Sequence, residues 1–219
     1  ARVAGKVRGG QMQQDFSKTS LTKSLDDSLK RLKTDYVDIY QLHSPDQETL
    51  ERGEVFETLA EFQKAGKIRA AGVSLLSWDH LEYCFRNGIS FAQLEADFLS
   101  GIDRSGDLAS AADQGIVVAA RQAFGSGLMA MDSGGWSAEQ FGNDPDRLAR
   151  AKDRMARLKR IGDPFEVILK YLVYSSDFPA FLFATTNPEH LAKNLDVMDA
   201  DAPSPEEIEH LREIFTKKN

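Results

Sequence analysis

A histidine ends the strand-like segment DYVDIYQLH, at a position where side chains can do chemistry. Val37, Ile39 and Gln41 alternate with other residues, so their side chains share one strand face with His43. Pro45 stops the strand, because proline has no backbone donor. A histidine at the carboxyl end of a parallel strand lies where α/β folds bind ligands. His43 is therefore a candidate catalytic residue, and the alternative is a buried histidine satisfied by a neighbour.

A second candidate site is the helix start in ATTNPEHLAKN. Asn187 is a good N-cap and Pro188 suits the first helical position. Thr185 and Thr186 offer hydroxyl groups just before the helix. Free backbone N–H groups and the positive end of the helix dipole favour an anion there. The sequence therefore predicts a phosphate-binding helix start.

Composition limits the class of protein and its partners. The chain has 219 residues, 42% hydrophobic and 28% charged, which is typical of one soluble globular domain over residues 1–219. A formal net charge of −7 argues against a nucleic-acid partner, because phosphate contacts need clustered lysine and arginine. No run approaches the roughly 18 apolar residues of a membrane span. Neither the histidines nor Cys84 have metal-ligand spacing, so we expect no metal and no membrane partner.

The single cysteine, Cys84, excludes an internal disulfide and fits a reducing compartment. We therefore expect a cytoplasmic protein. The run KDRMARLKR is strongly charged, and a charge run of this kind is more often a solvated helix face than a binding patch.

Strand-like and helix-like runs alternate along the chain without a linker. The expected strands are residues 1–7, 36–43, 67–74, 90–96, 116–121 and 178–186, and the expected helices are residues 20–34, 54–66, 77–88, 107–115, 145–160 and 188–198. Leu21, Leu25, Leu29 and Leu32 fall on one helical face. A closing helix follows SPEE, which is a capping box at Ser204.

Repeated strand-then-helix units require right-handed crossovers and a parallel sheet. Their near-uniform spacing favours a barrel over a doubly wound sheet. The sequence predicts an α/β fold in which six of the eight βα units of a (β/α)8 TIM barrel are followed by a C-terminal helix. A complete barrel of this kind typically needs roughly 250 residues, so six units fall two short.

Three phrases of this sequence resemble the aldo-keto reductases, in the right order and at the right separations. They are SLKRLKTDYVDIYQLHSPD, KIRAAGVSLLSWDHLE and FATTNPEHLAKNL. The resemblance implies a (β/α)8 barrel that transfers hydride between a nicotinamide cofactor and a small-molecule aldehyde, ketone or sugar carbonyl. The cofactor is usually NADP, and NAD is the alternative.

The family's catalytic tetrad is Asp, Tyr, Lys and His. VAGKVRGG resembles the lysine motif of the third strand, so the resemblance makes Lys6 the tetrad lysine and His43 the tetrad histidine. His43 would donate a hydrogen bond to the substrate oxygen, and Lys6 would lower the pKa of the tyrosine acid. The family's aspartate and tyrosine lie upstream, on elements that this chain does not contain.

The tyrosines in this sequence are not expected to replace that acid. Tyr36 and Tyr40 alternate with the His43 face and should point toward the helices, whereas Tyr83, Tyr171 and Tyr174 lie in helical runs away from strand ends.

The resemblance also assigns cofactor residues. Ser74 matches the serine beside the nicotinamide carboxamide, but Leu75 stands where an asparagine is usual. Gln93 matches the glutamine that contacts the same group. Arg121 replaces the tyrosine that stacks on nicotinamide, and a guanidinium plane can stack as well.

The remaining assignments follow the cofactor toward its phosphates and adenine. Gln122, Phe124 and Ser126 would lie along the pyrophosphate, and the alternative for this segment is an ordinary flexible loop. His190 stands at the position of the arginine that grips the 2′-phosphate of NADP. Asn194 matches the adenine-binding asparagine, although Lys193 replaces its glutamate partner.

Two functions stay open at this point. The first is an aldo-keto reductase whose first two βα units are removed or are supplied by another segment or partner chain that completes the barrel. The second is a reductase-derived nucleotide-binding or assembly module without catalysis.

Overall fold

The computed structural model describes residues 6–8, 11–96, 104–131 and 133–216. The chain forms two compact units. The first comprises residues 1–94 and 106–119, and the second comprises residues 95–105 and 120–219.

The first unit contains a parallel sheet, a small hairpin and five helices within its described part. Its strands are β1 (Lys6–Arg8), β2 (Gln11–Gln13), β3 (Val37–His43), β4 (Ile68–Ser74), β5 (Phe91–Glu95) and β6 (Val117–Arg121), the last two of which continue into the second unit. Its helices are α1 (Lys18–Leu32), α2 (Gln47–Arg52), α3 (Glu54–Lys64), α4 (Leu81–Arg86) and α5 (Ser105–Asp113). A single turn of 3-10 helix (Trp78–His80) precedes α4.

The larger sheet has the strand order β3-β4-β5-β6-β7, where β7 is Ala180–Phe181. β3 pairs with β4, and β4 pairs with β5, in parallel. The backbone N–H of Val117 donates to Ser90 O (3.0 Å), and that of Ala96 donates to Arg121 O (3.1 Å), so β6 follows β5 in the same direction. The predicted α/β fold with a parallel sheet is confirmed. β3 and β7 are the edge strands of this sheet, which is not closed in the part that the structure describes.

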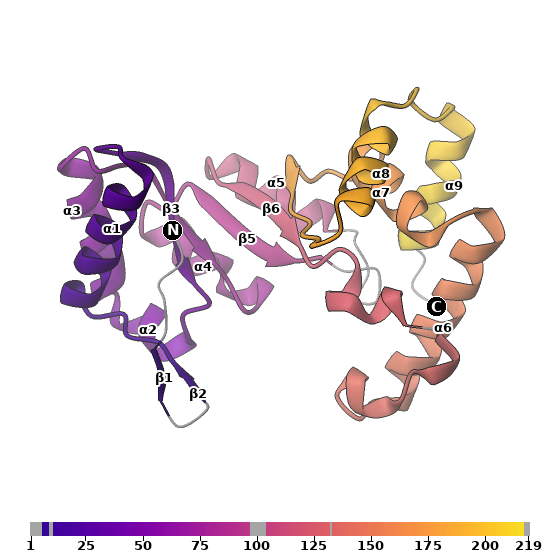
Figure 1. The fold of residues 1–219 in the computed structure, drawn as a ribbon, viewed down its shortest axis with the longest axis horizontal. Coiled ribbons are helices and arrows are strands. Elements are labelled where there is room, and N and C mark those ends of the chain that lie inside the picture. The colour runs from indigo at the N-terminus through magenta and orange to yellow at the C-terminus, as the bar shows by residue number, and fades with distance from the viewer. Residues whose placement is uncertain (1–5, 9–10, 97–103, 132, 217–219) are drawn as a thin grey trace. The chain divides into compact units, whose positions relative to one another are not determined.

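One face of β3 and β4 is apolar and lies under helices. Figure 1 shows α1 and α3 side by side against these strands, at the indigo end of the chain. The Tyr40 ring meets the Phe62 ring edge to face at a centroid distance of 6.0 Å. The core of this unit includes Leu21, Leu25, Tyr40, Leu42, Leu59, Val73, Ala92 and Leu94, all fully or almost fully buried.

Helix α1 shows how the sequence forms these elements. Ser17 caps it by accepting a hydrogen bond from the backbone N–H of Ser20, and Lys33 ends it in a left-handed conformation (φ 55°). Leu21, Leu25 and Leu29 are buried, as their spacing predicts. Leu32, which the spacing places on the same helical face, is 62% exposed. It lies in the last turn, directly before the chain leaves the helix.

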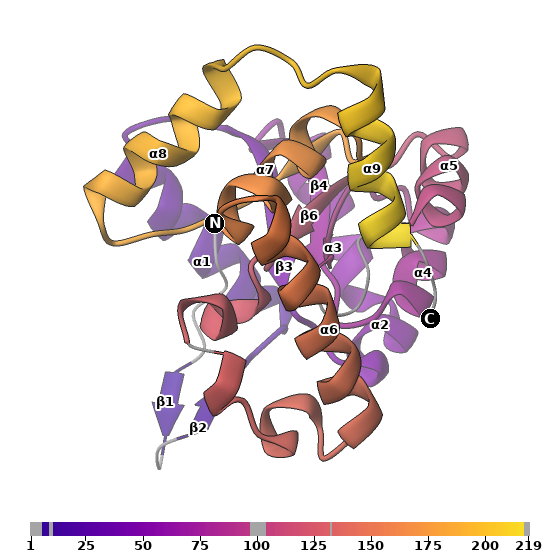
Figure 2. The same ribbon diagram turned by 90° about the vertical axis from the view of Figure 1, so that its right-hand side faces the viewer.

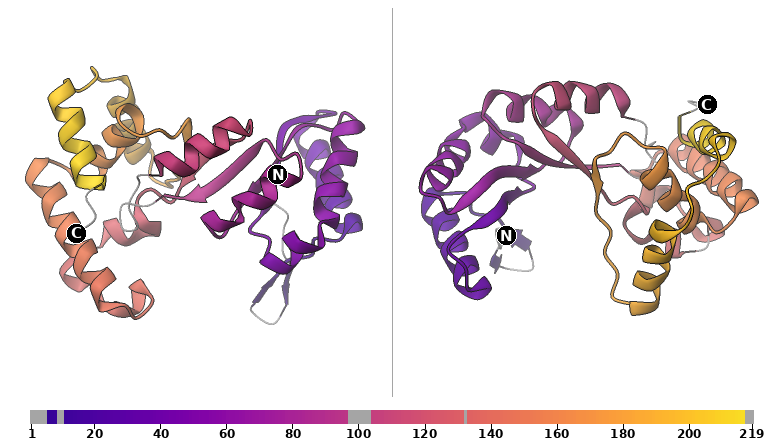
Figure 3. Two further views of the ribbon diagram at one scale, coloured as in Figure 1. Left: turned by 180° about the vertical axis from the view of Figure 1, so that it is seen from behind. Right: turned by 90° about the horizontal axis from the view of Figure 1, so that it is seen from above.

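The segment expected to be the first parallel strand forms a hairpin instead. β1 and β2 pair antiparallel, with Arg8 opposite Gln11, in a two-stranded sheet of their own. Two glycines lie between these residues in the sequence, and two-residue glycine connections are typical of hairpins. In the right-hand view of Figure 3 the hairpin lies on the other side of β3 from α1 and α3.

The second unit is mainly helical in its described part. Its helices are α6 (Pro145–Ile161), α7 (Pro164–Tyr174), α8 (Pro188–Asp199) and α9 (Pro205–Thr216). α7 packs against α6, α8 and α9, as the orange and yellow segments of Figure 2 show. The Tyr171 and Phe215 rings lie 4.3 Å apart between α7 and α9. Asp144, Asp163 and Asn187 cap α6, α7 and α8, and each is followed by a proline at the first helical position.

Two segments of the second unit depart from the expectations. The strand expected over residues 178–186 is only β7, which continues in one further bond from Leu182 N to Ala120 O (2.8 Å). The glycine-rich segment after β6 is folded into short 3-10 helices, Gly125–Ala130, Ser133–Gly135 and Ala138–Phe141. The buried Trp136 and Phe141 rings pack together there at 5.6 Å, so this segment has a small core. Among the residues described in either unit, no helix is both long and apolar enough to cross a membrane.

Candidate active site

Three candidate side chains of the first unit end neighbouring strands or lie close to their ends. His43 is the register partner of Ser74, and Ser74 is the register partner of Gln93. Two backbone hydrogen bonds of 2.9 Å continue the row, from Ser44 N to Ser74 O and from Leu75 N to Gln93 O. Register partners in adjacent parallel strands point to the same face of the sheet. The sheet therefore presents an imidazole, a hydroxyl and a carboxamide in one row at its carboxyl edge.

These three side chains lie on the face of the sheet opposite to α1 and α3. Ser74 is 5% exposed, and His43 and Gln93 are half-buried. Leu75, where the family has an asparagine, is fully buried and belongs to the core. A buried hydroxyl beside a carboxamide offers both donors and acceptors at close range. That combination suits an uncharged ligand group such as the carboxamide of a nicotinamide ring.

Gln41 lies two residues before His43 on the same face and contributes an unsatisfied acceptor. Its side-chain oxygen Oε1 is buried without a hydrogen-bond partner. Gly72 is its register partner, and a Cβ atom on Gly72 would lie 2.7 Å from Gln41 Cγ. The glycine therefore leaves the space that the Gln41 side chain occupies. A buried acceptor without a partner is costly unless a ligand or water supplies a donor, which fits a binding surface at this face.

His43 is held at the end of β3 by its neighbours. Ser44 has a left-handed backbone (φ 54°), which a non-glycine residue rarely adopts. Gln14 reaches His43 from the segment between β2 and α1, where its Nε2 lies 2.8 Å from the His43 carbonyl oxygen and 3.4 Å from ring atom Nδ1. Sequence reasoning missed Gln14, because no spacing rule links residues so far apart in the chain.

Lys6 is the first residue of β1 and lies in the antiparallel hairpin. The expectation that it ends a strand of the parallel sheet is therefore wrong. The glycine pair that follows Arg8 favours a hairpin over a crossover. The side chain of Lys6 lies outside what the structure describes, so its catalytic role stays a prediction.

Four of the chain's five tyrosines lie where the sequence predicts, whereas Tyr36, which is expected to point toward the helices, is 36% exposed. Tyr40 is fully buried against α1, where its hydroxyl donates to Leu21 O at 3.4 Å, and burial raises its pKa. Tyr36 precedes β3 and lies under the Arg69 guanidinium at 4.3 Å. Tyr83 is in α4, and Tyr171 and Tyr174 are in α7. No tyrosine of this sequence therefore ends a strand of the sheet.

The candidate residues after β6 belong to the second unit. Arg121 ends β6, and its Nη1 donates to the side-chain oxygen of Gln122. Gln122 has a left-handed backbone (φ 60°), as Ser44 has after β3. The Phe124 ring packs on Phe165 of α7 at 5.2 Å. Ser126 lies in the 3-10 helix Gly125–Ala130, and its side chain is outside the described part. Left-handed residues directly after strand ends are typical of functional sites.

The start of α8 has the cap that the sequence predicts. Asn187 Oδ1 accepts from Glu189 N at 2.9 Å, and Thr185 Oγ1 accepts from Asn187 N at 3.1 Å. Thr186 and His190 are exposed beside this cap. Asn194 is half-buried one turn after His190. Exposed polar groups at a capped helix start fit a phosphate-binding site, which stays a prediction for these four candidates.

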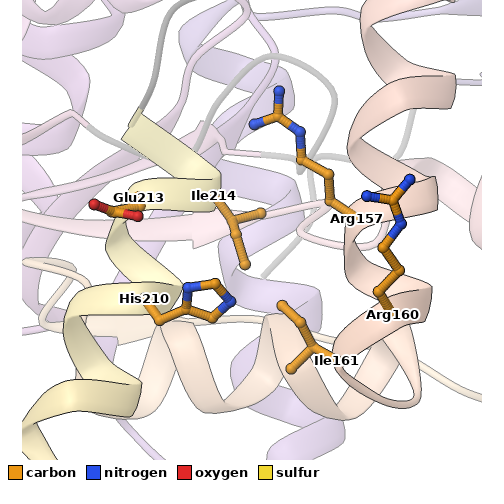
Figure 4. A pocket seen from close by; sticks show the side chains of 6 residues that line it. All are labelled: Arg157, Arg160, Ile161, His210, Glu213 and Ile214. Atoms are coloured by element: carbon orange, nitrogen blue, oxygen red, sulfur yellow. The ribbon is translucent and has the colours of Figure 1, made fainter.

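A hollow of about 210 Å³ lies between α6 and α9 in the second unit. It is lined by Arg157, Arg160, Ile161, His210, Glu213 and Ile214. In Figure 4 the two guanidinium groups and the imidazole extend in different directions rather than toward one point. Arg157 Nε is paired with Asp153 Oδ2 of the same helix at 2.9 Å. This geometry indicates that the charged run in α6 forms a solvated helix face rather than a binding patch.

Comparison with known proteins identifies relatives of this chain. Aldo-keto reductase YhdN of Bacillus subtilis (strain 168) is 37% identical over 75 residues, which are 34% of this chain and 22% of that protein. The NADH-specific methylglyoxal reductase of Escherichia coli (strain K12) is 26% identical over 222 residues, which cover 90% of this chain and 66% of that protein. The chain thus spans less than two thirds of either relative.

A solved structure supports the same relationship at the level of the fold. The holo form of aldo-keto reductase AKR11C1 from Bacillus halodurans is similar with a TM-score of 0.73 and 22% sequence identity, over 98% of this chain and 72% of that one. The model of the aldo/keto reductase family matches residues 1–215. The chain belongs to the aldo/keto reductase family.

Proposed function

We propose that this protein is an NAD(P)H-dependent oxidoreductase that reduces an aldehyde, ketone or sugar carbonyl by hydride transfer. The observation that carries the proposal is the row of His43, Ser74 and Gln93 at the carboxyl edge of the parallel sheet. Active sites of (β/α)8 barrels lie at this edge, and the family uses it for a nicotinamide cofactor and a carbonyl substrate.

The bound cofactor would supply the hydride. Ser74 and Gln93 would hydrogen-bond its carboxamide and so fix which face of the ring meets the substrate. His43 would donate a hydrogen bond to the carbonyl oxygen, where negative charge grows as the hydride arrives. Because such a donor stabilises the transition state more than the ground state, it contributes directly to the rate.

The remaining candidate cofactor residues all lie in the second unit. We assign Arg121, Gln122, Phe124 and Ser126 to the ring and pyrophosphate, and Thr185, Thr186, His190 and Asn194 to the 2′-phosphate and adenine. NADP is the cofactor we favour, with NAD as the alternative. The relative from Escherichia coli is named as NADH-specific, and an exposed histidine at position 190 is a weaker phosphate ligand than an arginine.

Lys6 and a tyrosine would provide the proton in the family mechanism. Since no tyrosine of this sequence ends a strand of the sheet, the acid must come from a preceding segment or a partner chain that completes the barrel. The same observation favours a second candidate function, a non-catalytic nucleotide-binding or assembly subunit derived from a reductase.

Cofactor titration tests the proposal. NADPH and NADH are added to the 219-residue chain and binding is followed by calorimetry. Gln93→Ala should weaken binding by about tenfold, because it leaves buried polar groups unpaired. Gln63→Ala is the matched control, since Gln63 lies on α3, away from the row of His43, Ser74 and Gln93, and donates to Arg69 O at an exposed position. The assignment of the cofactor site to this edge of the sheet would be refuted if neither NADPH nor NADH binds. It would also be refuted if Gln93→Ala and Gln63→Ala bind the cofactor equally well.

A further inference from the structure

We propose that Gln14 is a positioning residue that sets the tautomer of His43. This inference rests on the proposed function, in which His43 donates a hydrogen bond to the substrate oxygen. Gln14 is half-buried in the segment between β2 and α1. Its amide nitrogen lies within hydrogen-bond distance of both the His43 carbonyl oxygen (2.8 Å) and the ring atom Nδ1 (3.4 Å).

The carbonyl contact decides which way the Gln14 amide is turned. A backbone carbonyl can only accept, so the amide atom that faces it must be the NH₂ group rather than the oxygen. That NH₂ group has two hydrogens. One is used by the carbonyl, and the other is free to donate to Nδ1 of the same residue, which lies 3.4 Å from the amide nitrogen.

The state of the imidazole follows from this geometry. An N–H group that faces Nδ1 is satisfied only if Nδ1 carries a lone pair, so the neutral ring must hold its proton on Nε2. The Nε2–H form is the one that can donate to a substrate oxygen from the far side of the ring. With the proton on Nδ1 instead, a lone pair on Nε2 would face the growing negative charge and raise the barrier.

The local chain geometry keeps Gln14 in place. Asp15 Oδ1 accepts from Ser17 N at 2.9 Å, and Ser17 in turn caps α1. These contacts fix the backbone directly after Gln14. A single amide that bonds both the backbone and the ring of His43 also restrains rotation of the ring. Gln14 therefore acts on the reaction through His43, without contact to the substrate.

Nuclear magnetic resonance tests the proposal without substrate or cofactor. The two ring nitrogens of ¹⁵N-labelled histidine have distinct chemical shifts and couplings when protonated or not, and His43→Ala identifies the His43 signals. At a pH of about 8, where an ordinary histidine is neutral, His43 should show a bare Nδ1 and a protonated Nε2. A protonated Nδ1 in the unmodified protein would overturn the proposal, whatever the variants do.

Gln14→Glu and Gln14→Ala both remove the NH₂ donor, and a carboxylate is in addition repelled by the His43 carbonyl oxygen that the NH₂ group faces. Both variants should therefore lower the ratio of Nε2–H to Nδ1–H, by about three- to tenfold in Gln14→Ala. Gln63→Glu is the matched control, since it makes the same change at another glutamine that donates to a backbone carbonyl. An unchanged tautomer ratio in Gln14→Ala would overturn the proposal. If the chain binds no cofactor, the proposed function fails while this measurement still reads the tautomer.

Discussion

Replacing Gly72 by alanine should destabilise the first unit by overfilling the face that carries the candidate site. A Cβ atom at this position would lie 2.7 Å from Gln41 Cγ, 3.0 Å from the Phe91 carbonyl oxygen and 3.3 Å from Phe91 Cβ. Real Cβ atoms do not approach other atoms to 2.7 Å, so the Gln41 side chain must move. The Phe91 contacts come from the paired strand β5, which cannot move without breaking the register.

The magnitude follows from two opposing effects. Overpacking a filled interior costs about 1–3 kcal/mol of folding free energy. Alanine in place of glycine regains about 0.4–1 kcal/mol, because the unfolded chain has fewer conformations to lose. The net loss should therefore be about 1–2 kcal/mol. Gln41→Ala removes the shortest contact, so the double variant should lose less than the sum of the two single variants.

Urea unfolding measures these free energies. Gly106→Ala is the matched control, because Gly106 lies in α5 with no atom within 4 Å of the added Cβ. The same chemical change should there stabilise the protein by up to about 0.5 kcal/mol, since alanine is the better helix former. A Gly72→Ala protein as stable as the unmodified protein would refute the packing argument, as would strict additivity with Gln41→Ala.

Two further predictions concern Cys84 and His190. Burial raises the pKa of Cys84 to about 12 from an ordinary value of 9.0, so the unfolded chain loses this proton first and folding stability falls as the pH rises from 9 toward 12. Above pH 9 the free energy of unfolding of the unmodified protein should fall more steeply with pH than that of Cys84→Ala, by about 1.4 kcal/mol per pH unit. Parallel curves of unfolding free energy against pH for the two proteins would contradict this. The ratio of NADPH to NADH affinity should rise in His190→Arg, because a guanidinium group binds a phosphate with two hydrogen bonds and an imidazole does not. An unchanged ratio in that variant would exclude position 190 as the contact to the 2′-phosphate.

Much of the parallel sheet and the helix caps could be predicted from local patterns. β3 ends at His43, as alternation and Pro45 indicate. Asn187 caps α8, and Ser204 and Glu207 form the capping box of α9, with bonds of 3.3 Å and 2.8 Å between backbone N–H groups and side chains. These features depend on residues two or three positions apart, so a sequence contains enough information to locate them.

The features that could not be predicted depend on tertiary context. A short apolar run such as that of residues 178–186 fits a strand. The length of a strand, however, depends on the adjacent strand with which it can pair, and β7 comprises only Ala180–Phe181. The contact between Gln14 and His43 joins residues 29 positions apart and follows no periodicity. The hairpin of β1 and β2 was predictable in principle, because the glycine pair that precedes Gln11 is a hairpin signal.

The most direct test of carbonyl reduction at this site is NADPH or NADH oxidation with a panel of aldehydes, using protein whose intact mass matches these 219 residues. We predict negligible turnover by this chain, since it has no tyrosine at a strand end of the sheet, and general acid catalysis is commonly worth about 10²–10⁴-fold. Joining two βα units of a family member, with their tyrosine, ahead of Ala1 should produce turnover that His43→Ala then removes. Robust turnover by the 219-residue chain alone would contradict the need for an added tyrosine acid. Turnover by the joined protein that survives His43→Ala would contradict the role of His43 as the donor to the substrate oxygen.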